Sequence, residues 1–190
     1  HLSRYFNQRG WDVVGFARRK SGIGEHCRFV EWDGKSMADW AEELNGSDVL
    51  VNLAGRSVNC RYNAANKREI LDSRLQSTNV LGRAISDCDD PPELWMNSSM
   101  ATIYRHADDR PQSDIGELGE GFSAETAKAW ESAFFGSRVS GRVRKVALRT
   151  TMVLGDERGS VFRYLLNLAK IGFGGRVGSG KQMVSWVHVD

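Results

Sequence analysis

The stretch Val49-Leu-Val-Asn-Leu-Ala-Gly55 decides the fold of this chain. It is almost continuously apolar up to Ala54 and stops at Gly55, which is typical of a central parallel strand covered on both faces. Outward from it, other apolar runs bounded by turn residues alternate with helical stretches, as in βαβ units. The sequence therefore predicts an α/β fold, with a doubly wound, mostly parallel sheet and helices on both faces.

The other elements are expected on either side of this strand. Further strands are predicted at residues 11–17, 27–32, 93–99, 143–154 and 183–189. Helices are predicted at residues 36–44, where Ser36 is the expected cap, and at 63–87, 123–137 and 161–170. Residues 104–121 are expected to form a polar loop over the carboxyl edge of the sheet, and residues 172–181 are too rich in glycine for regular structure.

Composition excludes several classes of partner. Lys and Arg number 26 against 24 acidic residues, and no run of like charges forms a basic stripe, so nucleic acid is not an expected partner. No apolar stretch approaches the roughly 20 residues that cross a bilayer, so no membrane association is expected and the cytoplasm is the default location. Three cysteines without C-x-x-C spacing give no disulfide framework and no metal site.

The beginning of the chain predicts a missing piece. An open doubly wound sheet needs a first strand and a phosphate-cradling turn before its first helix, yet residues 1–9 already resemble the end of that helix. About 10 to 20 preceding residues with a G-x-x-G-x-x-G turn are therefore expected.

The order of several motifs resembles one family. These motifs are Val51–Gly55, Lys67, Ser73–Arg74, Ser99–Tyr104, Trp130–Glu131 and Ser185–Asp190. Together they resemble the atypical extended short-chain dehydrogenases/reductases known as nucleoside-diphosphate-sugar epimerases. The resemblance implies that residues 1–190 form an NAD(P)-binding Rossmann-type domain, incomplete at both ends, with residues 172–190 leading toward a substrate-binding part. It also implies a small-molecule substrate and, by analogy with the superfamily, a homodimer.

The resemblance also assigns cofactor-binding positions. Asn52, Leu53, Ala54 and Gly55 match the N-x-A-G turn beneath the ribose and pyrophosphate of the cofactor, where glycine lets the backbone approach the ligand. Asp33 matches a position beside the adenine, and Arg74 matches a helix position that faces the cofactor pocket. Thr150, Thr151 and Val153 match the strand end beside the nicotinamide. The alternative for each is an ordinary strand-end or cap residue.

The end of the first visible strand predicts the choice of cofactor. NAD-selective domains place an acid there for the ribose 2′-hydroxyl, whereas a 2′-phosphate needs cations. This strand ends in Arg18, Arg19 and Lys20, which favours NADP(H) over NAD(H). Arg19 is the predicted phosphate clamp, Lys20 adds charge, and Arg18 takes the role if the register is shifted by one. The alternative is a solvated basic strand end.

One departure from the family pattern bears on catalysis. Short-chain dehydrogenases move a proton with a Tyr-x-x-x-Lys pair, and this chain has none; the resemblance places Ser123 and Ala127 at those positions. The catalytic candidates that remain, flanking the cleft, are Ser99, Thr102, Tyr104 and His188. Their alternative is a structural hydrogen-bonding role.

Three functional hypotheses follow. The first is an NADP(H)-dependent oxidoreductase or epimerase acting on a small hydroxyl, carbonyl or nucleotide-sugar compound. The second is a module that binds NADP(H) without turnover, as a sensor or assembly factor. The third is a nucleotide hydrolase using the G-x-x-x-x-G-K match at residues 175–181, but Gln182 replaces the Ser or Thr that binds Mg²⁺ and a strand follows.

Overall fold

Parallel strands and the helices between them make up the computed structural model, which describes residues 1–22, 26–156 and 160–189. In chain order the main elements are α1 (Leu2–Asn7), β1 (Val14–Ala17), β2 (Arg28–Glu31), β3 (Val49–Asn52), α2 (Ala64–Asp87), β4 (Leu94–Met100), α3 (Phe122–Gly136), β5 (Arg144–Thr150), β6 (Met152–Leu154), α4 (Val161–Lys170) and β7 (Trp186–His188). Three short 3₁₀ turns join them: η1 (Lys20–Gly22), η2 (Asp39–Leu44) and η3 (Ala101–Ile103).

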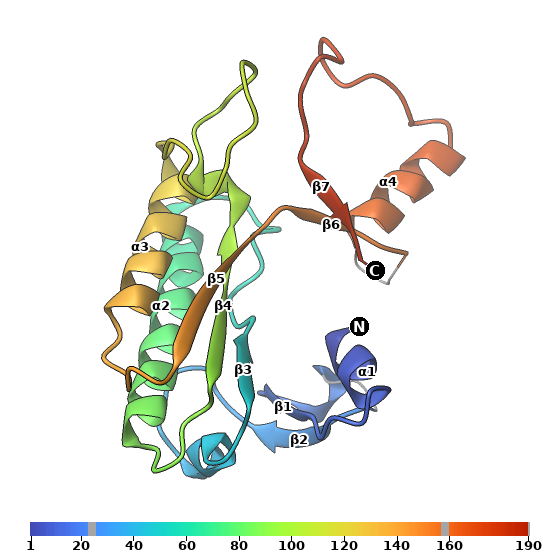
Figure 1. Cartoon of the computed structure of the whole chain (residues 1–190). Coiled ribbons are helices and arrows are strands. Elements are labelled where there is room, and N and C mark those ends of the chain that lie inside the picture. The colour runs from blue at the N-terminus through green and yellow to red at the C-terminus, as the bar shows by residue number, and fades with distance from the viewer. Residues whose placement is uncertain (23–25, 157–159, 190) are drawn as a thin grey trace.

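The strands pair in three parallel groups. β3, β4 and β5 form one sheet in that order, β1 pairs with β2, and β6 pairs with β7 (Figure 1). In the three-stranded sheet Val49 lies opposite Leu94, and Leu94 lies opposite Arg144. The predicted α/β fold with mostly parallel strands is confirmed.

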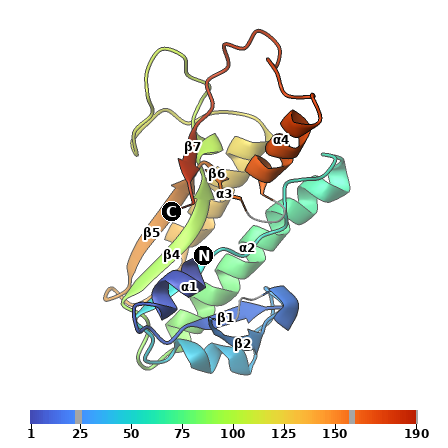
Figure 2. The same ribbon diagram turned by 90° about the vertical axis from the view of Figure 1, so that its right-hand side faces the viewer.

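The core lies between the three-stranded sheet and two helices. α2 and α3 cover one face of this sheet, and α1 lies on its other side (Figures 1 and 2). Trp95 of β4 is fully buried and meets Phe134 of α3 edge-on, with ring centroids 4.7 Å apart. Alternate residues of β4 are buried, as expected when one face packs on helices. This layer holds the carboxyl ends of β3, β4 and β5 at one edge.

Local signals account for α2. The Asn63 side chain accepts a hydrogen bond from the Asn66 N–H at 2.8 Å, so it caps the helix, and Cys88 is extended after the last turn. The helix predicted over residues 63–87 is therefore confirmed, as is α4 over 161–170.

Two predicted elements are wrong in part. Ser36 does not cap a helix, because Asp33 accepts hydrogen bonds from the N–H groups of Lys35 and Ser36 and holds that segment in a turn; the short η2 begins only at Asp39. The predicted strand over residues 143–154 is two strands, since β5 ends at Thr150 and β6 leaves the sheet to pair with β7.

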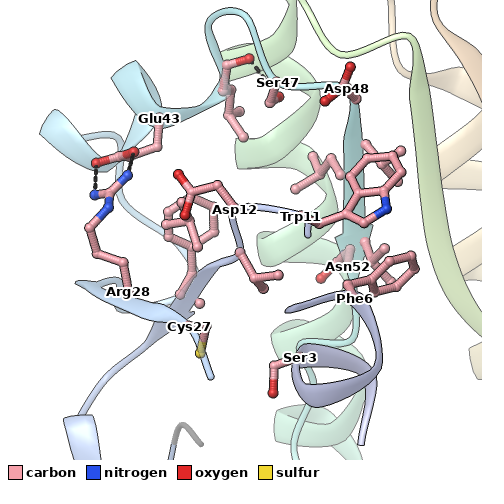
Figure 3. A pocket seen from close by; sticks show the side chains of 18 of the residues that line it. Ser3, Phe6, Trp11, Asp12, Cys27, Arg28, Glu43, Ser47, Asp48 and Asn52 are labelled. Carbon is pink, nitrogen blue, oxygen red and sulfur yellow. Dashed lines mark hydrogen bonds and ion pairs between the residues drawn. The ribbon is translucent and has the colours of Figure 1, made fainter. Parts of the chain in front are cut away.

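A groove of about 720 Å³ separates β1 from β3. Its walls are the facing edges of these two strands, Leu81 of α2 lies among its lining residues, and α1 contributes Leu2, Ser3 and Phe6 (Figure 3). Within the described residues β1 is hydrogen-bonded to β2 and β3 to β4, but β1 and β3 do not pair. The sheet is thus split at this groove.

Candidate functional site

The turn after β3 is held from below by a buried amide network. Asn52, only 2% exposed, accepts a hydrogen bond from the Ala54 N–H at 3.0 Å and donates to the Asn97 side-chain oxygen at 2.7 Å. Thr78 of α2 lies 3.4 Å from both amides and accepts a hydrogen bond from the Trp130 indole of α3 at 2.8 Å. The turn at residues 53–55 is therefore tethered to β4, α2 and α3.

Gly55 completes this turn at the point where α2 comes closest. A Cβ at Gly55 would lie 3.4 Å from the Arg74 side chain, so the glycine leaves the turn in direct contact with α2. Arg74 is 7% exposed, and its guanidinium lies over the Trp130 ring, 5.1 Å from the centroid. Gly55 thus lies against Arg74 in the turn that Asn52 holds, and the binding of a ligand by these residues stays a prediction.

A second cavity, of about 670 Å³, opens beside the same turn. It joins the ends of three neighbouring segments: Arg18 follows β1, Asp33 follows β2, and Ala54 and Gly55 follow β3. The N–H groups of Ser36 and Lys35 lower the pKa of Asp33, so its carboxylate stays charged. Arg18 and Asp33 thus line the cavity at the ends of parallel strands, whose carboxyl ends bind ligands in such folds. Its other charged lining residues are Arg56, Glu69 and Asp72.

Of the three basic residues after β1, only one lines this cavity. Arg18 is one of its lining residues, whereas Arg19 and Lys20 are exposed and lie outside the lining. Of the three basic strand-end residues, the one that lines the cavity is thus Arg18, which was predicted as the clamp if the register is shifted by one. Leu53 is 58% exposed and lines the groove between β1 and β3 instead.

A charged network occupies the carboxyl ends of β4 and β5. Ser99 donates a hydrogen bond of 2.6 Å to Glu131 of α3, and Arg149 of β5 grips the same carboxylate through two contacts of 2.8 Å. Burial raises the pKa of Glu131, but the hydrogen bonds from Arg149 and Ser99 outweigh it and leave that pKa below its ordinary value. Arg149 also donates to the Tyr104 phenol oxygen at 2.8 Å. Ser99 and Tyr104, two predicted catalytic residues, therefore belong to one network.

The other predicted residues are more scattered. Thr102 is exposed in η3, and Thr150 is exposed at the end of β5. Val153 and His188 lie in the separate β6–β7 sheet, where Leu154 is paired with His188. Roles for these residues and for Thr151 stay predictions.

Two polar residues of this network were not foreseen as partners. Glu131 follows Trp130 on the buried side of α3, and Arg149 lies near the end of β5, an edge strand of the three-stranded sheet. A charged residue within each predicted element was the available signal. The helix positions that match the usual Tyr-x-x-x-Lys pair have a structural environment. Ala127 is fully buried, and Lys128 donates to the Gly119 carbonyl at 3.2 Å, holding the loop before α3.

The described ranges contain neither a cluster of metal ligands nor a helix suited to a bilayer. No group of three or more His, Cys, Asp or Glu side chains there is placed to hold a metal ion. No helix in the same ranges is both long and apolar enough to cross a membrane.

Comparison with known proteins assigns the chain to a family. The sequence profile of the NAD dependent epimerase/dehydratase family matches residues 1–190. Human epimerase family protein SDR39U1 is 30% identical over 198 residues, which cover 99% of this chain and 61% of that protein. The chain thus spans about three fifths of the length of this relative.

Solved structures give the same result. The crystal structure of human SDR39U1 (isoform 2) with NADPH has a TM-score of 0.82 at 30% identity, covering 98% of this chain and 61% of that one. MoeE5 in complex with UDP-glucose and NAD has a TM-score of 0.78 at 22% identity, covering 100% and 63%, which is a likeness of fold. The predicted resemblance to extended short-chain dehydrogenases is confirmed.

Proposed function

Because this chain belongs to the NAD dependent epimerase/dehydratase family, we propose that it binds NADP(H) and serves as an oxidoreductase or epimerase for a small hydroxyl, carbonyl or nucleotide-sugar compound. The observation that carries the proposal is the cavity in which Arg18, Asp33 and the Gly55 turn converge. The human relative was solved with NADPH, and MoeE5 with UDP-glucose and NAD, which supports both the cofactor and the substrate class.

The residues present fit a dinucleotide. We propose that the Gly55 turn, against which Arg74 packs, contacts the ribose and pyrophosphate, and that Asp33 in the cavity lining contacts the adenine. Arg18 would hold the 2′-phosphate. When bound, the nicotinamide supplies hydride chemistry, and the chain supplies orientation.

Proton movement is assigned to Tyr104. Its phenol oxygen already accepts a hydrogen bond from Arg149, so its own O–H is left to donate to a substrate oxygen. Ser99 donates to Glu131 and thereby positions the network, while Thr102 and His188 are proposed to contact substrate from η3 and β7.

A second candidate function is binding without turnover. The buried Ala127 at the position of the usual lysine favours it. A screen of the intact protein with NADPH against carbonyls, and with NADP⁺ against alcohols and nucleotide sugars, separates the two when both the redox state of the cofactor and the formation of epimerised sugar are followed. Turnover that Tyr104→Phe abolishes supports the enzyme; bound cofactor with neither redox change nor sugar product supports the module.

Cofactor selectivity provides a direct prediction. The intact protein is expected to bind NADPH more tightly than NADH, and Arg18→Ala is expected to weaken NADPH alone by about 1.5 to 3 kcal/mol, the range for hydrogen bonds to charged groups. Arg19→Ala is the matched control, expected to have the smaller effect because Arg19 lies outside the cavity lining. Calorimetric titration of the native protein and both variants with NADPH and NADH measures the six affinities. Equal affinity of the native protein for both cofactors would contradict the prediction.

We also propose that one more parallel strand fills the groove between β1 and β3 in the intact protein. β1 runs parallel to β2, and β3 runs parallel to β4. α1, the first helix of the chain, contributes residues to the lining of the groove. The segment expected ahead of His1 is the proposed occupant, and its addition would join β1–β2 and β3–β5 into one continuous sheet.

Hydrogen exchange tests this strand. In the intact protein the amides of β1 and β3 should be protected as strongly as those of β4, because both of their edges would then be paired. Amides on the groove side of β1 and β3 that exchange as fast as those of the exposed residues 176–181 would show that the groove is open.

A further inference from the structure

Arg74 is a buried cation whose charge is not matched. Its residue surface is 7% exposed, and no carboxylate of the described residues forms an ion pair with it. The nearby acids are used elsewhere: Glu131 pairs with Arg149, and Glu69 pairs with Arg56. Burial lowers the pKa of Arg74, although a guanidinium remains charged throughout the usual range of pH. An unpaired buried charge is costly, so a folded protein retains one mainly where something else compensates it.

The guanidinium has one edge without a hydrogen-bond partner among the described residues. Nη1 donates to the carbonyls of Ile70 at 2.8 Å and Arg56 at 3.2 Å, which fixes the plane of the group. Nε is buried without a hydrogen-bond partner, and Nη2 donates to no group in the described part of the chain. Nε–H and Nη2–H form the edge with which arginine grips a phosphate or carboxylate through two parallel hydrogen bonds.

The position of this edge is informative. Arg74 touches the Gly55 turn on one side and Trp130 on the other, at the carboxyl ends of the parallel strands. The cavity that holds Arg18 is lined from α2 by Glu69, Asp72, Ser73 and Gln76, and not by Arg74. Arg74 and Arg18 therefore lie at different places around the Gly55 turn.

We infer that Arg74 binds a phosphate oxyanion at the Gly55 turn, supplied either by the pyrophosphate of the dinucleotide or by the diphosphate of a nucleotide-sugar substrate. This inference rests on the proposed function and specifies the anionic group that its site takes. The phosphate brings the missing negative charge to Arg74, and the carbonyls of Ile70 and Arg56 keep the guanidinium in place for it.

Binding of the intact protein to NADPH, NADH and UDP-glucose tests the inference. Arg74→Met removes the charge and keeps a long side chain against Trp130; Arg74→Lys keeps the charge without the fork. If the dinucleotide supplies the phosphate, Arg74→Met weakens NADPH and NADH by the same factor, roughly ten- to a hundredfold, and Arg74→Lys recovers part of the loss. If the substrate supplies it, only UDP-glucose is weakened. Arg18→Ala, which should affect NADPH alone, is the matched control.

Stability separates binding from folding. Without ligand, Arg74→Met should melt no lower than the native protein, since it removes a buried charge that has no partner. Unchanged affinity for all three ligands in both variants would overturn the inference and leave the proposed function standing. If the native protein binds none of the three ligands, the proposed function is wrong. The binding of inorganic pyrophosphate then tests the inference about Arg74 by itself. The inference fails if pyrophosphate does not bind the native protein, or if it binds Arg74→Met equally well.

Discussion

Replacing Glu131 with glutamine is expected to lower the free energy of unfolding by about 2 to 3 kcal/mol. The variant keeps the shape of the side chain but removes the charge that Arg149 grips through two hydrogen bonds. The carboxylate side chain is 10% exposed and the guanidinium 25%, so water replaces little of the lost interaction. Urea denaturation of the native and variant proteins at neutral pH measures the difference.

The same pair predicts a dependence on pH. The folded pKa of Glu131 lies below the ordinary value of 4.5, so its stabilising contribution is complete above that value and is lost as the pH falls through the folded pKa. The stability gap between native protein and Glu131→Gln should therefore narrow only below about pH 4.5. A gap that stays constant down to pH 3, or one that narrows between pH 8 and 6, would contradict the assignment.

A double-mutant cycle isolates the interaction. Arg149→Met removes the cation, and the cost of Glu131→Gln should shrink in that background because no guanidinium is left unpaired. Strict additivity of the two substitutions would show that the contacts contribute no coupling energy.

The sequence predicted elements where a local pattern was sufficient. The apolar run before Gly55 and the periodic apolar positions after Asn63 each specify an element from within a single stretch, and β3 and α2 are found there. It failed where a choice depends on distant partners. Residues 143–154 are predicted as one strand, yet the chain divides at Thr151 because β6 pairs with β7 and not with β4.

The candidate site shows the same limit. The turn at residues 52–55 could be read from its glycine, but the ion pair of Glu131 with Arg149 joins α3 to β5, and nothing in either stretch indicates the distance between them. The choice between Arg18 and Arg19 depends on which of two adjacent side chains the strand directs toward the cavity, a property of strand register and twist.

The largest effect is expected for Asn52→Leu, which should lower the free energy of unfolding by about 3 to 5 kcal/mol. Leucine resembles asparagine in size, so little volume changes at this fully enclosed position. Its side chain cannot accept from the Ala54 N–H or donate to Asn97, and each buried polar group left without a partner costs about 1 to 3 kcal/mol.

The Asn52→Leu substitution should also weaken cofactor binding, whether or not the cofactor carries a 2′-phosphate. The Asn52 side chain ties the turn at residues 53–55 to β4, so its loss frees the backbone that the dinucleotide would contact, and NADPH and NADH should lose affinity equally. Asn79→Leu is the matched control, because Asn79 lies exposed on α2 and surface substitutions usually change stability by less than about 0.5 kcal/mol. Urea denaturation and calorimetric titration of both variants provide the measurements. If Asn52→Leu proved as stable as Asn79→Leu, the amide network would not hold the turn, and the preorganisation of the Gly55 turn for a ligand would lose its structural basis.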